Sequence, residues 1–338
     1  PGVHSVDKIE VTSSNYVIYL KSGALLVPNH LYTISKLTEE NEPHEPGAAA
    51  ATGIDGTMRY PFITAKSKNN VMILGHGTID FTKLDWKERS GIVMSYGGNL
   101  TIDGITMVNP AAWSTNLFRN QGITVNEVAI FGYRTNSDGI AVCNSTYATV
   151  SDCFARSGDD LFEVKTLGGD AEGIASNITF SNCTAWASKA RCFGITGEVN
   201  NNISNVVFEN SSVIYRDAVW DNNILGSLAI VALDGAGERQ ISGITFRNIE
   251  IYNDYGRPVI ATTGGSFNDN DNKCTITEIL YENIKFSSTL KMKFEREYAT
   301  NTFSSVTIRD VRSGNTKITD NNYTSYLESY TYTIFDFE

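Results

Sequence analysis

Residues 178–183 read Ile178-Thr-Phe-Ser-Asn-Cys183, a short β-branched and aromatic run, an asparagine, and the start of a second short run. The same form recurs along most of the chain. Its instances begin at Thr101, Ile123, Thr149, Ile178, Val206, Ile244, Ile279 and Val306. Their polar members are Asp103, Asn126, Asp152, Asn182, Asn210, Asn248, Asn283 and Asp310, at successive spacings of 23, 26, 30, 28, 38, 35 and 27 residues. An internal repeat of this length indicates a stacked, repetitive architecture.

Each repeat is predicted to be one coil of a solenoid. Strands of three to five residues would pair in parallel with the same strands one coil above and below, about 4.8 Å away. Asn and Asp tolerate the left-handed conformation that a bend requires, so we expect the polar members to stack in one line. A β-sandwich, with strands every 8–12 residues, explains the long spacing poorly. The predicted fold class is all-β, a single right-handed parallel β-helix.

The two ends of the chain differ from the repeats. Residues 1–68 contain a strand pair around Val17 and an Ala/Glu/Pro-rich loop at 36–56, which predicts an N-terminal cap with the first strands. Residues 69–312 are predicted to form the catalytic β-helix, and the Thr/Tyr-rich residues 313–338 a C-terminal cap, because a solenoid needs its open edges covered. The chain opens Pro-Gly-Val-His without Met or a signal peptide, so we expect a processed or trimmed N-terminus.

Composition limits the function classes. The 338 residues carry a net charge of −11, which disfavours nucleic-acid binding and, more weakly, a polyanionic glycan. No apolar stretch approaches the roughly 18 residues of a membrane span. Of the five cysteines (Cys143, Cys153, Cys183, Cys192 and Cys274), the first three fall within strand-like runs and are expected to be buried small hydrophobes; one disulfide is left open, and the odd count leaves at least one free thiol. The four histidines all precede the aspartate motifs, which excludes a Ser–His–Asp triad there and a His-rich metal site.

Two neighbouring coils carry similar polar segments after their second strand. One reads Arg134-Thr-Asn-Ser-Asp-Gly-Ile-Ala-Val, and the other Arg156-Ser-Gly-Asp-Asp-Leu-Phe-Glu-Val. Each begins with Arg and carries an aspartate before a run that ends in Val, and we expect Asp138 and Asp159 to occupy equivalent positions one coil apart, 21 residues along the chain. Asp160 adjoins them. We therefore expect three carboxylates in a groove on one face of the solenoid.

Three adjacent carboxylates favour acid–base chemistry. Like charges raise at least one pKa, so that one acid keeps a proton while the others stay ionised. Glycoside hydrolysis needs such an unequal pair, an acid for the leaving oxygen and a base for water. Two alternatives remain for these motifs. They can be ordinary Asp-Gly turns, or they can bind calcium, although the chain lacks an EF-hand or nonapeptide calcium pattern.

Three motifs resemble one enzyme family. Asn136-Ser-Asp-Gly-Ile, Gly158-Asp-Asp and Gly75-His-Gly-Thr-Ile-Asp80 look like the polygalacturonases and their β-helical relatives, the dextranases and isopullulanases. The resemblance covers most of residues 69–260. It implies an inverting glycoside hydrolase without metal or other cofactor, in which Asp159 is the general acid and Asp138 and Asp160 activate the water.

The chain departs from that family at two motifs. Polygalacturonases carry Gly-His-Gly one coil after the Asp pair, where Arg191 stands here. They also carry an Arg-Ile-Lys that grips the uronate carboxylate, and the corresponding coil has a lone Arg216 beside Asp217. The Arg-Thr-Asn-Ser-Asp-Gly-Ile run looks closer to the dextranases. These departures favour a neutral glycan over galacturonan.

Further residues are candidates for substrate binding. Arg134 and Asn136 flank the first aspartate motif. Trp113 and Trp220 could stack on sugar faces, although both residue types are also common in cores. Three further candidates, Lys189, Arg191 and Glu198, could bind substrate hydroxyls or orient Asp160, or could form a surface salt-bridge cluster. Arg216 completes the set.

The leading hypothesis is an inverting hydrolase acting outside the cell or in the periplasm, on a polysaccharide or oligosaccharide. In such an enzyme the acid and base carboxyls lie about 6.5–9.5 Å apart, so we expect Asp159 at that distance from one base. A β-helical polysaccharide lyase is a second hypothesis, which the absence of a matching Arg or Lys pair disfavours. A carbohydrate-binding solenoid without catalytic activity is the third.

Overall fold

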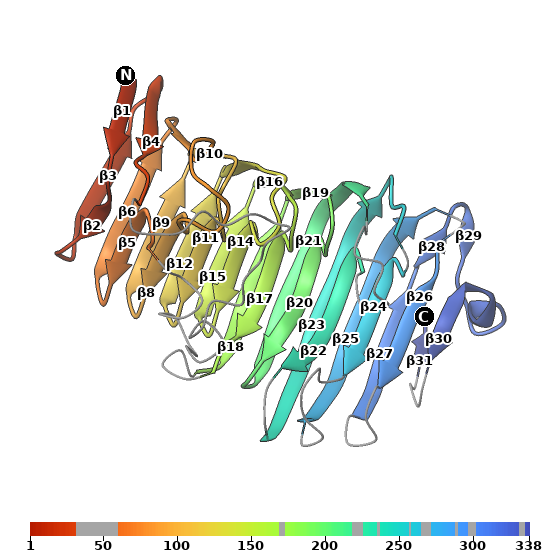
Figure 1. Ribbon diagram of the computed structural model, residues 1–338. Helices are drawn as coiled ribbons and strands as arrows, with labels where there is room; N and C mark the ends of the chain where they lie inside the picture. The colour runs from red at the N-terminus through yellow and green to blue at the C-terminus, as the bar shows by residue number, and fades with distance from the viewer. Residues whose placement is uncertain are drawn as a thin grey trace.

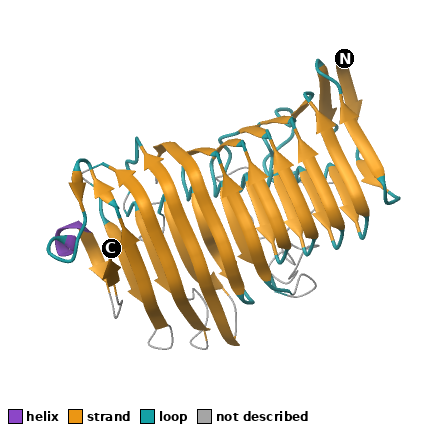
Figure 2. Ribbon diagram, turned by 180° about the vertical axis from the view of Figure 1, so that it is seen from behind, coloured by secondary structure: helices purple, strands orange, loops and turns teal. Residues whose placement is uncertain are grey.

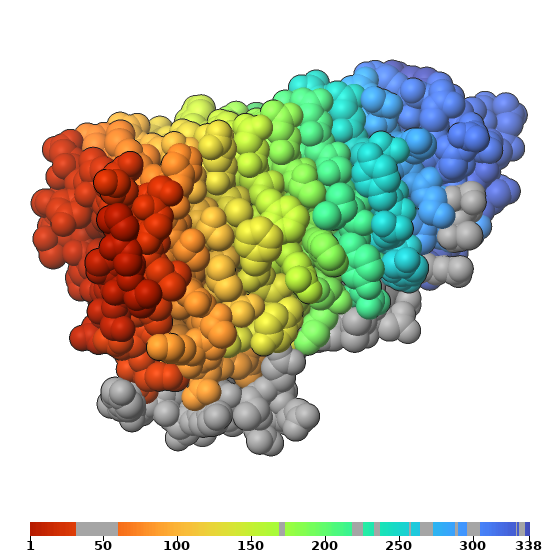
Figure 3. All heavy atoms as spheres, turned by 90° about the horizontal axis from the view of Figure 1, so that it is seen from above, coloured from red at the N-terminus to blue at the C-terminus, as the bar shows by residue number. Residues whose placement is uncertain are grey.

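The computed structural model describes residues 1–31, 60–168, 173–217, 226–234, 237–256, 258–264, 272–287, 290–296, 302–330 and 335–338. Within these residues the chain forms a single right-handed parallel β-helix, with its two termini at opposite ends of the stack (Figure 1). The space-filling view shows successive coils as bands that follow each other along the molecule (Figure 3). The predicted fold class is confirmed.

The strands form two sheets. The larger sheet contains β1 (Gly2–Val6), β3 (Tyr16–Leu20), β4 (Ala24–Pro28), β6 (Asn69–Gly75), β7 (Thr78–Asp80), β9 (Gly98–Asp103), β10 (Thr106–Val108), β12 (Gln121–Asn126), β13 (Ala129–Phe131), β15 (Thr146–Ser151), β16 (Phe154–Ser157), β18 (Ala175–Ser181), β19 (Thr184–Ala187), β21 (Ile203–Arg216), β23 (Gly237–Ile251), β25 (Asn272–Phe286), β27 (Thr302–Arg309), β28 (Arg312–Ser313), β29 (Thr316–Lys317) and β31 (Phe335–Phe337). The second sheet contains β2 (Ile9–Val11), β5 (Ile63–Lys66), β8 (Ile92–Ser95), β11 (Thr115–Phe118), β14 (Ile140–Cys143), β17 (Phe162–Thr166), β20 (Phe193–Val199), β22 (Leu228–Asp234), β24 (Ile260–Gly264), β26 (Met292–Arg296) and β30 (Leu327–Tyr330).

A column of left-handed residues bends each coil within the larger sheet. Six of the predicted polar residues have φ between 48° and 55°: Asp152, Asn182, Asn210, Asn248, Asn283 and Asp310. Their amides connect neighbouring coils, since Asn248 donates to Asn210 and Asn283 donates to Asn248, each over 2.9 Å. The prediction that Asn182, Asn210 and Asn248 share one line along the axis is confirmed.

The first two members of the predicted line are displaced by one residue. Asn126 pairs with Asp103 and with Ser151, the residue before Asp152. The left-handed positions of those two coils belong instead to Gly104 (φ 80°) and Glu127 (φ 50°). Glycine adopts this conformation without steric cost, so the bend there does not need Asn or Asp. Assigning Asp103 and Asn126 to the bend was therefore wrong.

A second column of asparagines was not predicted from the sequence. Asn15, Asn70, Asn99, Asn177 and Asn205 also lie in the left-handed region, with φ between 53° and 57°. Asn70 donates to Asn15 over 2.7 Å, and Asn99 donates to Asn70 over 3.1 Å. These residues kink the first strand of each coil near its start. Two columns of this kind set the cross-section of the solenoid.

Stacked aromatic rings fill the core between the sheets. Phe180, Phe208, Phe246 and Tyr281 come from successive coils, with neighbouring ring centroids 5.0, 5.0 and 5.2 Å apart and nearly parallel planes. Aromatic pairs of this kind contribute about 0.5–1.5 kcal/mol each beyond their burial. The five cysteines are also buried, and all are free thiols. The core therefore holds the coils in register without cross-links.

The ends of the solenoid are built differently. β1 already pairs in parallel with β4, and β2 with β5, so the coil begins within residues 1–31. At the other end, β28 and β29 form an antiparallel pair, followed by the 3₁₀ helix η3 (Tyr323–Tyr326) beside the C-terminus (Figure 2). Within the described residues, no helix has the length and hydropathy needed to cross a bilayer.

Candidate active site

The three aspartates lie where the chain enters two neighbouring strands of the second sheet. Asp138 precedes β14 and is separated from it by one residue. Asp159 and Asp160 precede β17, and one residue lies between Asp160 and that strand. Each aspartate offers an oxygen within 4.8 Å of the others. Their exposed fractions are only 2%, 8% and 2%. The structure therefore brings together the three residues that the sequence singled out.

The register differs by one residue from the expected equivalence of Asp138 with Asp159. Ile140 pairs with Phe162, and the backbone N–H of Gly139 donates to the carbonyl of Asp160 over 2.8 Å. Asp138 is therefore equivalent to Asp160, and the predicted equivalence of Asp138 with Asp159 is wrong.

The sequence already carried this register. Counted residue by residue, both segments read Arg-x-x-x-Asp, and this form aligns Asp138 with Asp160, as the strand pairing does. The expectation was therefore displaced by one residue, because the two adjacent aspartates of the second segment were exchanged. The two arginines themselves do not pair, since Arg156 lies within β16 and pairs with Phe131, whereas Arg134 lies in the loop beyond β13.

Asp159 is held by backbone N–H groups. Asn136, in the left-handed conformation with φ 55°, donates its N–H to Oδ2 of Asp159 over 2.8 Å. The N–H of Asp160 donates to Oδ1 over 2.9 Å. Burial, followed by repulsion from Asp160, raises the pKa of Asp159 to about 6, although Lys165 and the two N–H groups oppose this. Asp159 can therefore carry a proton in mildly acidic solution.

Glycine at position 158 allows this loop to pack closely. A Cβ there would lie 2.4 Å from the carbonyl oxygen of Arg134 and 2.5 Å from that of Tyr133. Ser137 and Ser157, both buried, are joined at 2.9 Å between their hydroxyl oxygens. The Gly-Asp-Asp motif is thus needed for the contact between adjacent coils as well as for its carboxylates.

Asp160 is paired with Arg191. The backbone N–H of Arg191 donates to Oδ1 over 3.0 Å, and its Nη1 donates to Oδ2 over 2.7 Å. Burial alone would lower the pKa of Arg191, but Asp160 and Asp159 raise it above its usual value. Arg191 thus stands where the resembled family has histidine, and it neutralises one of the three carboxylates.

Asp138 has a different environment. Its Oδ2 lies 3.5 Å from the ammonium nitrogen of Lys165. Its Oδ1 is buried and has no hydrogen-bond partner within the described residues. Burial, then repulsion from Asp159 and Glu163, raises the pKa of Asp138 well above its usual value. The open Oδ1 is an acceptor that a water molecule or a sugar hydroxyl can satisfy.

A charged cluster beside Asp138 was missed at the sequence level. Lys165 lies 3.1 Å from Glu163 and 3.1 Å from Glu198, and Thr196 donates its hydroxyl to Glu163 over 2.6 Å. Burial raises the pKa of Glu163 to about 7. A signal was present in the sequence, because Glu and Lys alternate with apolar residues in Phe162-Glu-Val-Lys-Thr and so face one side of the strand.

The predicted substrate-binding residues are distributed unevenly around the trio. Lys189 donates to the hydroxyl of Thr135 over 2.6 Å, and Nη2 of Arg134 donates to the carbonyl of Thr82 over 3.2 Å, so both hold the loop beside Asp138. Trp113 precedes β11 and lies with one ring face 4.2 Å from the ammonium of Lys165. Asn136 and Arg191 contact Asp159 and Asp160 directly, whereas Trp113 and Glu198 reach the trio only through Lys165.

Arg216 does not belong to this group. It is fully buried, and its guanidinium binds Asp254 at 2.9 Å and the carbonyl of Pro258 at 2.7 Å. A side chain enclosed in this way leaves no surface for a substrate carboxylate, so its assignment to substrate binding is corrected. Trp220 lies outside the described residues.

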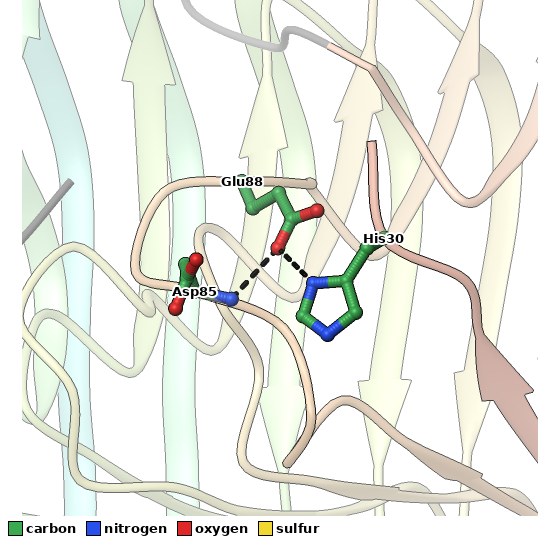
Figure 4. Close-up of side chains that lie close together, drawn as sticks. All are labelled: His30, Asp85 and Glu88. Carbon is green, nitrogen blue, oxygen red and sulfur yellow. Dashed lines mark hydrogen bonds and ion pairs between the residues drawn. The ribbon is translucent and has the colours of Figure 1, made fainter. Parts of the chain in front are cut away.

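A second group of potential metal ligands lies near the N-terminal coils. His30, Asp85 and Glu88 come within 4.8 Å of one another. Glu88 contacts the ring of His30 at 3.1 Å and accepts the N–H of Asp85 over 2.7 Å, as Figure 4 shows. Glu88 also accepts the N–H of Leu31. Through these contacts Glu88 joins the segment of His30 and Leu31 to the segment that contains Asp85. Nothing further in the group indicates a metal site.

Comparison with known proteins places the chain among glycoside hydrolases. The family model of the glycosyl hydrolases family 28 matches residues 46–327. A "Probable polygalacturonase" of Vitis vinifera is 26% identical over 178 residues, which cover 48% of this chain and 35% of that protein. The chain spans less than half of the length of the curated relatives it matches.

Solved structures share the fold. A polygalacturonase from Erwinia carotovora ssp. carotovora superposes with a TM-score of 0.71 at 17% identity, covering 99% of this chain and 86% of that chain. Dex49A from Penicillium minioluteum superposes with a TM-score of 0.67 at 14% identity, covering 98% of this chain and 56% of that chain. At these identities the likeness concerns the β-helix itself.

Proposed function

The chain belongs to family 28 of the glycosyl hydrolases, and on that premise we propose that it hydrolyses glycosidic bonds of a polysaccharide with Asp138, Asp159 and Asp160. One observation carries the proposal: three buried carboxylates meet at one end of β14 and β17, and each has different partners. Asp159 accepts backbone N–H groups, Asp160 pairs with Arg191, and Asp138 keeps one oxygen open. Unequal carboxylates of this kind can divide the roles of acid and base.

The proposed reaction transfers two protons. Asp159, with a pKa of about 6, donates its proton to the glycosidic oxygen as the bond to the anomeric carbon breaks. Water attacks that carbon and transfers a proton to the open oxygen of Asp138. Asp160, held by Arg191, stabilises the positive charge that develops on the sugar ring. The products are two sugar chains, and the enzyme is reset when Asp138 releases its proton to solvent and Asp159 takes one up.

Inversion at the anomeric carbon is proposed from the family and not from the carboxylate spacing. The closest oxygens of the trio lie within 4.8 Å, which is shorter than the 6.5–9.5 Å separation expected for an inverting pair. Proton NMR of the first product, recorded before mutarotation, tests this point. A retained anomer would identify one aspartate as a covalent nucleophile and would require new roles for all three.

For the substrate, we propose a polygalacturonate-type glycan. The curated relatives are named polygalacturonases, and this supports a uronate polymer over the neutral glycan expected from the sequence. Lys189 and Arg134, both partly exposed, are cations beside the trio that could meet a carboxylate. A neutral glycan remains a second candidate for one reason: Arg216, the cation in the segment that corresponds to the family's Arg-Ile-Lys, is buried against Asp254.

A panel of dextran, pullulan, polygalacturonate, arabinan and fructans, with product analysis, tests the proposal. Hydrolysis of polygalacturonate faster than every neutral glycan is expected. Faster cleavage of a neutral glycan would reverse the substrate assignment. A product that absorbs near 235 nm would instead indicate a lyase, and binding without cleavage of any glycan would indicate a carbohydrate-binding solenoid. Secretion to the cell exterior or periplasm is proposed as well, and fractionation of the native host tests it.

A further inference from the structure

The face of β17 that is directed toward Asp138 carries two charged side chains that the acid–base mechanism does not use. Glu163 and Lys165 alternate with core residues along the strand, and they are 0% and 3% exposed. The ammonium of Lys165 lies 3.5 Å from Asp138, 3.1 Å from Glu163 and 3.1 Å from Glu198. A buried lysine next to a catalytic carboxylate needs an explanation, because an isolated buried charge is strongly disfavoured.

The contacts of Lys165 match the donors that it has. An ammonium group carries three N–H donors, and three carboxylates from three segments surround it. The ring of Trp113 lies 4.2 Å away and covers a further side of the cation. The ammonium of Lys165 therefore binds carboxylates of its own chain. Because the side chain is buried, little of its surface is accessible to a substrate.

We propose that Lys165 is a positioning residue that keeps Asp138 ionised and oriented toward the attacking water. The inference rests on the proposed function for the role of Asp138. It goes beyond that function because it assigns a protonation control to a residue outside the trio. Lys165 contacts Oδ2 of Asp138, so Oδ1 remains the oxygen that is free to accept a proton from water.

The charged and titratable groups that face Lys165 come from several segments. They are Asp138 before β14, Cys143 on β14, Asp159 and Asp160 before β17, Glu163 on β17, and Glu198 on β20. Burial alone lowers the pKa of Lys165, but Glu163, Glu198 and Asp138 raise it well above its usual value. Lys165 thus stays charged over the whole range in which a glycoside hydrolase works. Among the interactions that shift the pKa of Asp138, the charge of Lys165 is the one that lowers it.

Removal of the Lys165 charge should move the pH optimum, whereas removal of the Glu163 carboxyl should not. In Lys165→Met, the pKa values of Asp138 and Asp159 both rise, because an opposite charge at this distance typically lowers a carboxyl pKa by about 1–3 units. The optimum of kcat/KM lies midway between the two pKa values, so it should move up by about one unit, and kcat should fall at least tenfold at the original optimum. Glu163→Gln should leave the optimum nearly unchanged, because Glu163, with a pKa of about 7, is largely protonated where Asp159 still carries its proton.

The controls separate positioning from a structural role. Lys293→Met removes another buried lysine of the same sheet, paired with Glu295 at 2.9 Å but on β26, and should leave the optimum unchanged. Lys165→Arg keeps the charge and should restore the optimum toward that of the unmodified chain. An unchanged optimum in folded Lys165→Met would overturn the inference. If Lys165→Met does not fold, Lys165→Gln, which loses the charge but keeps N–H donors, decides the question, and an unchanged optimum in that variant would overturn the inference.

A measurement without substrate keeps this inference separate from the proposed function. Carbon-13 NMR titration of the aspartate carboxyls, assigned with Asp138→Asn, should show Asp138 titrating at higher pH in Lys165→Met than in the unmodified chain. An inactive unmodified chain would refute the proposed function, yet the titration would still report on Lys165. Identical Asp138 titration curves in the two proteins would refute the role of Lys165, whatever the activity.

Discussion

Single residues in the site differ through their neighbours and not through their chemistry. Asp138, Asp159 and Asp160 carry the same carboxyl group, but one faces Lys165, one accepts two backbone N–H groups, and one pairs with Arg191. Partner type and burial together set which carboxyl holds a proton. The division of roles that we propose follows from these contacts.

Replacement of the trio is the direct test at this scale. Asp138→Asn, Asp159→Asn and Asp160→Asn should each reduce kcat by about 100-fold or more, the usual worth of a positioned acid or base. Circular dichroism and thermal unfolding check that the fold survives. Asp152→Asn is the matched control, since Asp152 is exposed in the left-handed column, which suits Asn. Turnover equal to that of the unmodified chain in any one variant of the trio would remove that residue from the mechanism.

The pH dependence of activity follows from the pKa of Asp159. Asp159 must be protonated to donate, and its pKa is about 6, so kcat/KM should fall as the pH rises through the range above 6. Asp138 must be ionised to accept a proton from water, and burial raises its pKa as well, so the protonated acid and the ionised base coexist only over a narrow pH range and activity should fall on the acid side too. Rates between pH 4 and pH 8, with thermal unfolding over the same range as a control, test this. Constant activity up to pH 8 would exclude Asp159 as the acid.

At the scale of the elements, the bend columns explain how short strands keep one register. Asn248 combines a φ of 54° with bonds to Asn210 and Asn283, so a single side chain serves the bend and two neighbouring coils. Asparagine supplies both properties, because it tolerates the left-handed region and its amide both donates and accepts.

Substitution of Asn248 should separate these two contributions. Asn248→Gly keeps the conformation but loses the two amide bonds, which should lower the free energy of unfolding by about 1–2 kcal/mol. Asn248→Val also places a β-branched residue in the left-handed region, which should cost roughly 1–2 kcal/mol more. Denaturant unfolding measures both. Equal stability of the two variants would mean that backbone strain at the bend is unimportant.

At the scale of the whole molecule, the solenoid needs its open strand edges covered. We propose that residues 313–338 form the C-terminal cap, and that residues 1–68 form the N-terminal cap with the first strands. β30 pairs with β26, β31 pairs with β27, and the ring of Phe335 lies 5.0 Å from that of Phe294. Without these elements, the last full coil would present unpaired N–H and C=O groups together with apolar side chains.

Deletion of residues 313–338 should therefore cause aggregation and lower the thermal unfolding temperature by several degrees. Size-exclusion chromatography with light scattering measures the first effect, and calorimetry the second. Phe335→Ala, which loses the ring contact but keeps the strand, should show a smaller decrease without aggregation. A monodisperse truncated chain with unchanged unfolding temperature would show that these residues are not a cap.

The repeat in the sequence was sufficient for the fold, because each coil must place a residue that tolerates the left-handed conformation at its bend, and Asn or Asp marks six coils in succession. The aspartate trio was equally visible, because Asn-Ser-Asp-Gly and Gly-Asp-Asp are local motifs. The prediction placed Asp103 and Asn126 at the bend of their coils, but the bend lies one residue later, at Gly104 and Glu127. Repeat spacings of 23–26 residues do not reveal a displacement of one residue.

Only the tertiary structure decided which residues meet. Asp138 faces Lys165, Asp159 accepts the N–H of Asn136, and Asp160 pairs with Arg191, and no local motif encodes these partners. The cluster of Lys165 with Glu198 likewise joins residues from neighbouring strands, and the burial of Arg216 depends on Asp254, 38 residues away along the chain. A sequence pattern determines which conformations are favourable locally, whereas contacts between coils depend on the register, which loop lengths and packing set together.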